Sequence, residues 1–350
     1  MRIPIVVLLA GLLSMESAEF NRTVFAAGPG NAATNLDAVD EDFKFQGEFS
    51  GQGAIQRNGS FEIQKMGLQV AAQGKGEFIG VVYLGGLPGS GWDRETKFKV
   101  RGKLQNNKVE LAGDGLQVVV TESDAKFAST EKLMVGELAK VERHSPTLGK
   151  RAPYNAFVIF DGSTSSEYLK NGKLDEEGFL KEGCEIVTPA NDFTLHLEFK
   201  LPYMPEARGQ GRANSGVYIH SRYEVQVLDS FALDGVFNEC GALYRYQPPN
   251  VNMCLPPLTW QTYDILYIAP RFDAEGNKIK NAVISVHHNG VPVQDQFEIE
   301  RATGAGQSVG EGPNPLPIKL QNHSNPVRYR NVWMVPHRNV EAPAPSLAKR

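Results

Sequence analysis

A short segment of the chain combines the bulk of a buried β-strand with side chains that could do chemistry. The sequence YEVQVLDS at 223–230 places Glu224, Gln226 and Asp229 among valine and leucine. Burying an unpaired carboxylate costs several kcal/mol, on the order of the net stability of a whole domain. These polar groups are therefore either held by structural partners or line a cleft.

One face of this strand could carry two carboxylates. Because alternate side chains of a strand share a face, Glu224 and Gln226 point one way and Asp229 the other, unless a β-bulge turns Asp229 round. A retaining glycosidase needs two carboxyl groups about 5–5.5 Å apart. Here the residue between the two acids is an amide, and Asp229 is a methylene shorter than glutamate. Ordinary double displacement is therefore not favoured.

The preceding run predicts a partner for this strand. NSGVYIHSR at 214–222 should form a tight hairpin with it, turning at Ser221 and Arg222. His220 would then adjoin the acidic strand, although a lone histidine at a hairpin end is more often structural. Asp229 can equally form a structural Asx turn at the end of its strand.

Length and composition indicate a soluble globular protein. The 350 residues suggest two domains of about 150 residues each. Hydrophobic residues make up 41% and charged residues 22% of the chain. The net charge of −4 does not favour binding to nucleic acid or to an anionic membrane surface.

The N-terminus has the pattern of a secretory signal peptide. Arg2 precedes the apolar run IPIVVLLAGLL at 3–13, and small residues follow near the end of the segment 1–27. The apolar run is too short for a comfortable membrane span. We expect export to the periplasm or the extracellular space, no membrane span after cleavage, and a flexible lead-in at 28–40.

The rest of the chain predicts an all-β protein of two domains. Short alternating runs divided by glycine indicate a small antiparallel β domain at 41–141, to which the sequence assigns no role. The Pro-containing segment 142–154 indicates an exposed linker that proteases should cut first. Regularly spaced strands at 155–336 favour a β-sandwich or jelly roll, and HNG at 288–290 predicts a type I′ hairpin turn. The Pro/Ala-rich tail at 337–350 should be disordered.

Three cysteines are too few for a disulfide scaffold. Cys240 and Cys254 bracket a Pro-rich loop, and either a bridge or buried thiols would fit them. The sequence contains no CxxC or His/Cys cluster that indicates zinc. It assigns no cofactor, and a divalent metal and the oligomeric state are both left open.

An ordered series of motifs resembles a known family over roughly residues 155–336, the 3-keto-disaccharide hydrolase domain. The motifs are FDG at 160–162, DFTLHLEFKLP at 192–202, NSGVYIHSRYEVQVLDS at 214–230, ECGALY at 239–244, VNMCLPPLTWQTYDI at 251–265, HNGV at 288–291 and LQNHSNPVRYRNVW at 320–333. The resemblance implies a concanavalin A-like sandwich. It also implies activity on 3-keto-glycosides, so the expected partner is an oxidised disaccharide or glycoside.

A ketone at C3 of the sugar opens a route that needs only one carboxylate. The ketone acidifies the hydrogen on C2, a base removes it, the enolate expels the group at C1, and water adds to the enone. This needs a base, a proton donor for the leaving oxygen, and a cation or hydrogen bond at the ketone oxygen. We expect Glu224 to be the base and His220 or Asp229 the donor. Arg222 or a bound metal would polarise the ketone.

The same motifs supply candidate substrate-binding residues: Asn214, Tyr218, Arg222, Gln226, Glu239, Tyr244 and His323. The alternative is a non-catalytic carbohydrate-binding or cell-surface module, because this sandwich also serves lectins and a fold does not fix function. A lectin face does not need two carboxylates beside a histidine and an arginine. The acidic strand therefore favours an enzyme, a hydrolase or lyase.

Overall fold

The computed structural model describes residues 32–131, 133–187, 190–303 and 309–337 of an all-β chain. Helical structure in these ranges is limited to the 3₁₀ helices η2 (Leu36–Ala38), η3 (Glu41–Phe45) and η4 (Gly209–Gly211). None of the described helices has the length and apolar character needed to cross a membrane. The signal peptide expected at 1–27 lies outside the described residues, as does all of the expected tail except residue 337.

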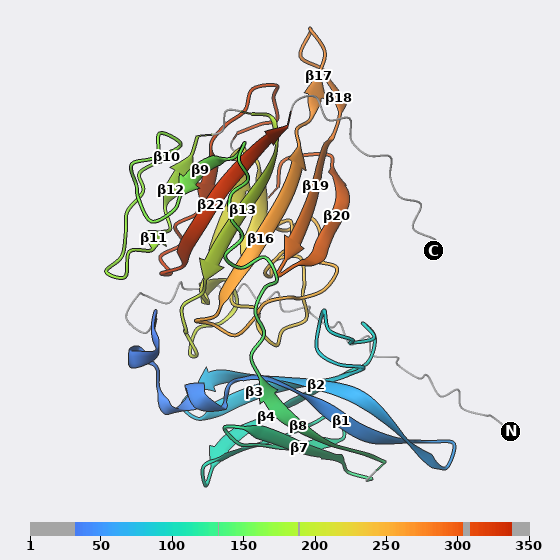
Figure 1. Cartoon of the computed structure of the whole chain (residues 1–350). Coiled ribbons are helices and arrows are strands. Elements are labelled where there is room, and N and C mark those ends of the chain that lie inside the picture. Colours follow the sequence, from blue (N-terminus) through green and yellow to red (C-terminus); the bar gives the residue numbers. More distant parts are fainter. Residues whose placement is uncertain (1–31, 132, 188–189, 304–308, 338–350) are drawn as a thin grey trace, which may run out of the picture.

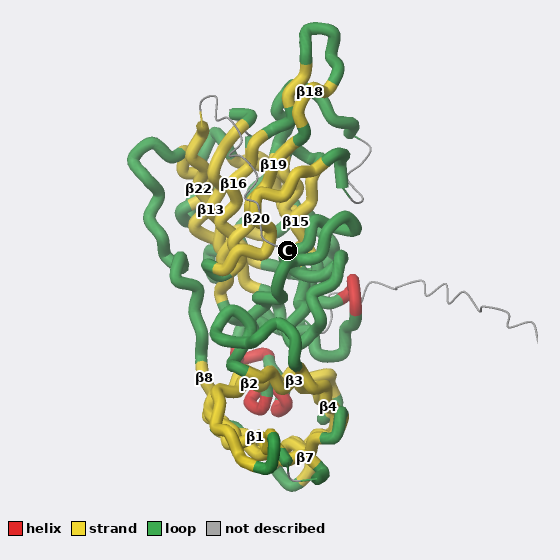
Figure 2. Tube along the Cα trace, turned by 90° about the vertical axis from the view of Figure 1, so that its right-hand side faces the viewer, coloured by secondary structure: helices red, strands yellow, loops and turns green. Residues whose placement is uncertain are grey.

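The N-terminal domain is a closed barrel of eight antiparallel strands (Figure 1). The strands are β1 (Gly47–Arg57), β2 (Ser60–Gly74), β3 (Glu77–Leu84), β4 (Lys97–Gln105), β5 (Lys108–Gly113), β6 (Leu116–Val120), β7 (Asp124–Ser129) and β8 (Met134–Val141). Each strand pairs with its neighbour in sequence, and β1 also pairs with β8 to close the barrel. Alternate apolar residues fill the interior, helped by Phe45 of η3, which lies inside the ring of strands (Figure 2).

The C-terminal domain is a sandwich of two sheets. The five-stranded sheet has the order β10 (Leu169–Lys170), β12 (Cys184–Ile186), β21 (Ile318–Leu320), β14 (Ser215–Ile219) and β15 (Tyr223–Val227). The seven-stranded sheet runs β11 (Leu180–Lys181), β22 (Arg328–His337), β13 (Asp192–Lys200), β16 (Trp260–Ile268), β19 (Ala282–His288) and β20 (Val291–Ile299), and β9 (Phe157–Phe160) pairs with β22. A two-stranded ribbon, β17 (Arg271–Phe272) and β18 (Lys278–Lys280), projects from it.

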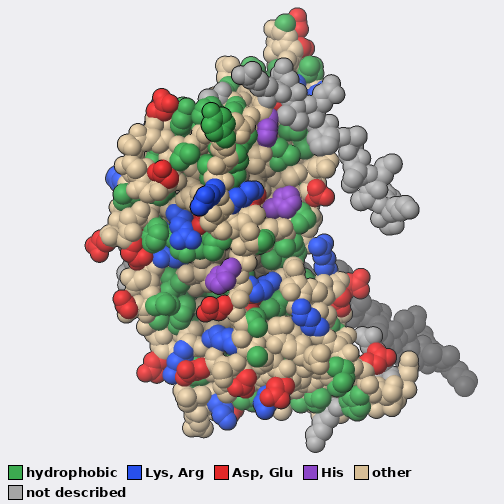
Figure 3. Space-filling view, viewed as in Figure 1, with side chains coloured by type: hydrophobic (Ala, Val, Ile, Leu, Met, Phe, Trp, Pro, Cys, Tyr) green, Lys and Arg blue, Asp and Glu red, His purple; other side chains and the backbone are tan. Residues whose placement is uncertain are grey.

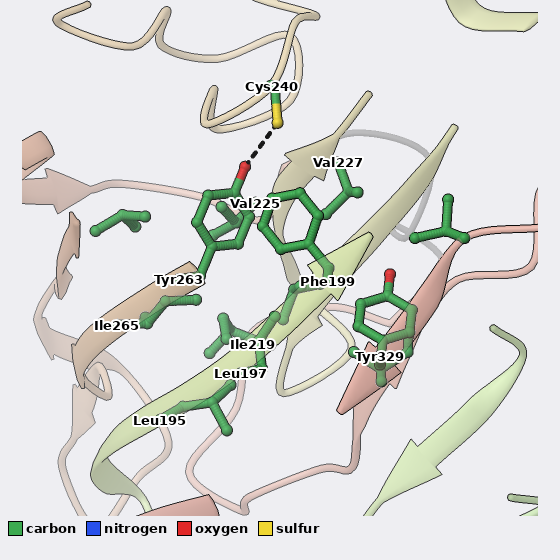
Figure 4. Packing of buried hydrophobic residues seen from close by; sticks show 14 of the residues in the cluster. Leu195, Leu197, Phe199, Ile219, Val225, Val227, Cys240, Tyr263, Ile265 and Tyr329 are labelled. Atoms are coloured by element: carbon green, nitrogen blue, oxygen red, sulfur yellow. Dashed lines mark hydrogen bonds between the residues drawn. The ribbon is translucent and has the colours of Figure 1, made fainter. Parts of the chain in front are cut away.

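Apolar side chains from both sheets meet between them. Leu195, Leu197 and Phe199 of β13 face Val225 and Val227 of β15 in one buried cluster (Figure 4). The predicted class, an all-β sandwich preceded by a small antiparallel β domain, is confirmed. The HNG turn also has the predicted geometry, because its asparagine and glycine both have positive φ.

The barrel and the sandwich share a hydrophobic cluster. Ala71, Val81 and Tyr83 of the barrel belong to the same buried cluster as the sandwich core. Arg208 Nη2 donates to the carbonyl of Gln73 on β2 at 2.7 Å. The two domains are therefore packed against each other through apolar and polar contacts.

The expected linker is not an unprotected segment. Thr147 Oγ1 donates to Asp264 Oδ2 at 2.7 Å, and the Gly149 amide donates to Glu198 Oε1 at 2.5 Å. These bonds tie the segment to β16 and β13, where it crosses the front of the seven-stranded sheet (Figure 1). Polar side chains on the outside of the sheet thus hold the segment in place, although most of its residues are exposed, and first cleavage by a protease at 142–154 stays a prediction.

The expected flexible lead-in is also ordered from residue 32 onward. Ala33 exchanges two backbone hydrogen bonds with Tyr203, at 3.0 and 2.8 Å. The Tyr203 hydroxyl donates to Asp40 Oδ1 at 2.8 Å. Tyr203 thus anchors the segment to the sandwich, a role that the sequence does not reveal.

Charged side chains of both signs are spread over the face of the molecule seen in Figure 3. This distribution agrees with the small net charge of −4.

Candidate active site

The segment 214–230 forms the predicted hairpin, and its loop contains His220 besides the expected Ser221 and Arg222. The turn residues are His220 and Ser221, with φ of 48° and 55°, and the Arg222 amide donates to the Ile219 carbonyl at 3.0 Å. Two positive φ values are the signature of a type I′ turn. In this register Tyr218 of β14 lies directly opposite Glu224 of β15.

Alternation along the two strands separates a core face from an outer face. Val217, Ile219, Val225 and Val227 belong to the core cluster. Tyr218, Glu224 and their in-phase neighbours therefore stand on the other side of the five-stranded sheet, which we call the outer face.

One row of cross-strand partners crosses the outer face. In order it contains Lys170 of β10, Glu185 of β12, Lys319 of β21, Tyr218 of β14 and Glu224 of β15. Direct partners in antiparallel strands point to the same side of a sheet. The row thus places a carboxyl group, a phenol and an ammonium group on adjacent strands.

A cleft of about 350 Å³ opens on the outer face. Its lining residues are Gly183, Cys184, Glu185, Tyr218, Ser221, Val309, Lys319, Leu320, Gln321 and Asn322. This volume is at the lower end of the range typical of ligand pockets, about 300–1,000 Å³. Tyr218 lines the cleft, whereas its partner Glu224 does not.

Glu224 is buried without a cation beside it. The side chain leaves only 2% of the residue exposed, and its Oε2 has no hydrogen-bond partner among the described residues. Burial raises the pKa of Glu224 to about 7, although a hydrogen bond with Tyr218 acts in the opposite direction. Gly216 makes room for the carboxyl group, because a Cβ there would lie 2.6 Å from Oε1.

Two phenols stand close to this carboxyl group. Gln321 Nε2 donates to Tyr218 Oη at 3.1 Å, and burial together with the charge of Glu224 raises the pKa of Tyr218. Burial and the same charge also raise the pKa of Tyr244, whose amide donates to the Glu224 carbonyl at 3.0 Å. A base with a pKa near neutrality and two neutral proton donors is a set suited to general acid–base catalysis.

Five of the ten unpaired buried side-chain atoms of the described residues belong to the hairpin or to the segment 321–325. Within the described residues, no partner satisfies Glu224 Oε2, Gln321 Oε1, Asn214 Oδ1, His323 Nδ1 or Asn325 Nδ2. Buried polar groups are normally hydrogen-bonded, so each exception needs an explanation. Of these five side chains, only that of Gln321 lines the described part of the cleft, where a ligand could satisfy its free oxygen.

Asp229 does not reach the outer face. The chain leaves the sheet after Val227, and Asp229 Oδ2 accepts a hydrogen bond from Arg212 Nε at 2.7 Å in a buried ion pair. Its Oδ1 accepts from the Phe231 amide at 3.2 Å, which is an Asx turn. The structure makes Asp229 an ion-pair partner, so the expected role as proton donor is wrong.

His220 also lies away from the carboxyl group. Its ring packs against Phe193 and Tyr267 of the opposite sheet, with centroid distances of 5.6 and 5.1 Å. Burial lowers the pKa of His220 to about 4. A turn histidine folded into the core cannot donate a proton on the outer face.

Arg222 and Glu239 stabilise loops. Arg222 donates to the carbonyls of Gly310 at 3.0 Å and Asn314 at 3.1 Å. Glu239 Oε2 accepts from the Gly235 amide at 2.6 Å and the Val236 amide at 3.0 Å, and burial raises the pKa of Glu239. Neither side chain lines the described part of the cleft, and both are held by loop backbone groups.

Gln226 and Asn214 are held at the edge of the site by η4. Gln226 Nε2 donates to Gln210 Oε1 at 2.9 Å, and Asn214 Nδ2 donates to the Gln210 carbonyl at 2.8 Å. Both are buried, and His323 is half-buried two residues beyond Gln321. Of the expected site residues, the structure brings Tyr218, Glu224 and Tyr244 together.

Two residues of the outer face were not anticipated, Lys319 and Gln321. Both flank Leu320 in the three-residue strand β21 and its exit. The run IKLQ at 318–321 alternates apolar and polar residues, but a three-residue strand is too short to predict from such a pattern. Gln321 does lie in the motif LQNHSNPVRYRNVW, and this was the one available signal.

The cysteines are free thiols, and no bridge joins Cys240 to Cys254. All three are buried, and Cys240 Sγ lies 3.1 Å from the Tyr263 hydroxyl (Figure 4). Among the described residues, no three His, Cys, Asp or Glu side chains form a group that could hold a metal ion.

The fold and the site define a two-domain all-β protein with one buried carboxyl group beside two phenols on a sandwich face. Residues 153–335, more than half of the chain, match the model of the family described as the 3-keto-alpha-glucoside-1,2-lyase-like domain. The chain belongs to this family, as its motifs predicted.

Solved structures and curated proteins were compared as well. A Parabacteroides distasonis protein named "putative glycosyl hydrolase" is 27% identical, with a TM-score of 0.47, over 53% of this chain and 85% of its own. A second protein of that name and organism is 15% identical, with a TM-score of 0.37, over 53% of this chain and 94% of its own. No curated protein matches the chain. The family assignment therefore rests on the family match.

Proposed function

We propose that the protein cleaves glycosides whose sugar carries a ketone at C3, by elimination followed by hydration. The observation that carries the proposal is Glu224, a buried carboxyl group that lies directly opposite the cleft-lining Tyr218. The family description supports the same chemistry.

The spacing of carboxyl groups on the outer face argues against double displacement. Asp229 is bound to Arg212, and the nearest other carboxyl group in the cross-strand row is Glu185. Three strand spacings of about 4.8 Å place Glu185 about 14 Å from Glu224. Glycosidases that use two carboxyl groups hold them about 5–9.5 Å apart. A reaction that needs one base fits this face better.

The proton on C2 leaves first. Tyr218 lines the cleft and Glu224 does not, so the Tyr218 oxygen takes the C2 proton while its own proton passes to Glu224. The electron pair of the C–H bond moves into the enolate at C3. It then forms the C1–C2 double bond as the bond from C1 to the leaving oxygen breaks. The proton held on Glu224 returns through Tyr218 to that oxygen, and water then adds across the double bond to form the 3-keto sugar.

The test compares oxidised and ordinary disaccharides. The protein is incubated with 3-keto-trehalose, 3-keto-lactose and their unoxidised parents, and free 3-keto-glucose is measured. We expect cleavage of the oxidised sugars alone. Equal cleavage of the parents would rule out the elimination route.

A second candidate is a non-catalytic carbohydrate-binding module. It is favoured by the 2% exposure of Glu224, because a ligand in the cleft would touch Tyr218 and not the carboxyl group. Saturable binding of the 3-keto sugars without turnover would support this candidate against the enzyme.

We also propose that the protein is exported, with residues 1–27 as its signal peptide. The support is the charged, apolar and small-residue order of that segment. N-terminal sequencing of the protein from cell fractions tests this proposal. An intact N-terminus in the cytoplasmic fraction would contradict it.

A further inference from the structure

Lys319 stands beside the proposed proton acceptor. It lies in β21 directly opposite Tyr218 of β14 and opposite Glu185 of β12. Because direct partners share a face, its side chain projects from the outer face next to the phenol. Lys319, Tyr218 and Gln321 together line the cleft.

The ammonium group of Lys319 is available to a ligand. Its Nζ is 3.9 Å from Glu185 Oε1, and the two side chains are 47% and 35% exposed. Exposed ion pairs at such distances contribute little to stability. Lys319 can therefore turn from Glu185 to an oxygen in the cleft at small cost.

No other cation competes for this role along the part of the cleft that the structure describes. Lys319 is the one lysine or arginine among the described lining residues. Arg222, the cation expected from the sequence, is bound to two loop carbonyls.

We infer that Lys319 donates a hydrogen bond to the C3 ketone oxygen and stabilises the enolate formed there. This inference rests on the proposed function. When the C2 proton leaves, the electron pair of the C–H bond becomes negative charge on the C3 oxygen. A cation that reaches that oxygen lowers the barrier, because the negative charge develops there only as the proton leaves C2.

The strand spacing suits a base and a cation that act on neighbouring atoms. Side chains directly opposite each other have Cβ atoms about 4.5–5.5 Å apart. Tyr218 takes the proton from C2, and Lys319 contacts the oxygen on the next carbon. The long lysine chain lets its ammonium group adjust to the sugar.

The experiment compares K319M, K319R and the matched control K170M. Lys170 lies in the same row but beyond Glu185, at the edge strand of the sheet. The two readouts are cleavage of 3-keto-trehalose and exchange of the C2 hydrogen of a methyl 3-keto-glucoside in D₂O. Removing one oxyanion donor costs about 10²–10³ in rate, so K319M should lose that much in both assays. K319R should recover part of the loss, and K170M should match the wild type.

The outcomes separate this inference from the proposed function. If the wild type exchanges and cleaves while K319M equals K170M, Lys319 has no role at the ketone and the proposed function stands. If the wild type does neither, both are overturned. If K319M slows cleavage but leaves exchange unchanged, Lys319 acts on the leaving group and the inference is wrong. Thermal melting verifies folding, and K319R decides the matter should K319M be unstable.

Discussion

Tyr218 and Glu224 face each other across β14 and β15, and only the tyrosine lines the cleft. The phenol thus stands where a ligand can touch it, and the carboxyl group stands where solvent cannot. In this arrangement Glu224 can act as a base on a ligand only through Tyr218, which would pass the proton to it. Because Glu224 is buried, ionising its carboxyl group also destabilises the folded protein.

Glu224→Gln should lower turnover and raise stability. Loss of general-base catalysis typically costs about 10²–10⁴ in rate. No cation is paired with Glu224, so neutralising it strands no charge among the described residues. Turnover and melting temperature at pH 8 are measured on the same variant. A large fall in melting temperature with normal activity would contradict this role.

The contribution of Glu224 to the stability of the wild type should fall between about pH 4.5 and 7. Burial raises the pKa of Glu224 from 4.5 to about 7, so the folded protein holds this proton more tightly than the unfolded chain. The contribution of Glu224 to the free energy of unfolding is fully present below pH 4.5 and is lost as the pH rises to 7. The shift corresponds to about 3 kcal/mol. Urea unfolding of the wild type and of Glu224→Gln is measured across this pH range. The difference between their free energies of unfolding should grow as the pH rises.

Activity should follow the opposite course. The base must be deprotonated, so kcat/KM should rise with pH and level off above about 7, the pKa of Glu224. Initial rates with 3-keto-trehalose between pH 5 and 9 give the profile. A profile that is flat through pH 7 would exclude Glu224 as the base.

Asp229→Asn should unfold the protein more readily without affecting chemistry. The change leaves the buried Arg212 without its anionic partner, and breaking a buried pair costs about 3–5 kcal/mol. The control is Asp234→Asn, which breaks half-exposed pairs with Lys97 and Lys99 and should cost less than about 1 kcal/mol. Urea midpoints and specific activity are compared. Normal stability with lost activity in Asp229→Asn would restore Asp229 to the mechanism.

Gly216→Ala should impair the site although it removes no chemical group. The new Cβ would lie 2.6 Å from Glu224 Oε1 and 3.0 Å from a ring carbon of Tyr218. Both groups must shift, and a misplacement of about 1 Å can cost on the order of 10²-fold in rate. The matching control is Gly310→Ala, where a Cβ meets nothing within 4 Å. Equal activity of Gly216→Ala and Gly310→Ala would show that Tyr218 and Glu224 can be displaced without loss of rate.

The fragment 155–337 should be less stable than the full chain. It lacks Ala71, Val81 and Tyr83, which pack into the sandwich cluster, and the β2 carbonyl that binds Arg208. Each buried apolar side chain contributes about 1.5–3 kcal/mol. Chemical unfolding of both proteins measures the difference. Equal midpoints would mean that the shared cluster is energetically neutral.

The sequence predicted the fold more completely than the site, for a physical reason. Period-two patterns and the HNG turn follow from local chemistry, and so do the all-β class and the β14–β15 hairpin. The direction of Asp229 depends on Arg212, and the burial of His220 depends on Phe193 of the other sheet. Such partners are distant in sequence, and no local pattern reports them. Lys319 was missed because its strand has only three residues, too few to be predicted as a strand from the sequence.

The pairing of the strands also sets an order of events during synthesis. Every barrel strand bonds to a neighbour in sequence, and closure needs only residues up to 141. By contrast, β13 lies between β16 and β22, and β22 begins at residue 328. Non-local pairing must wait until both partners exist, and domains of a nascent chain fold in turn. The barrel can therefore form first and remain beside an unfinished sandwich, whose seven-stranded sheet is completed only when β22 emerges.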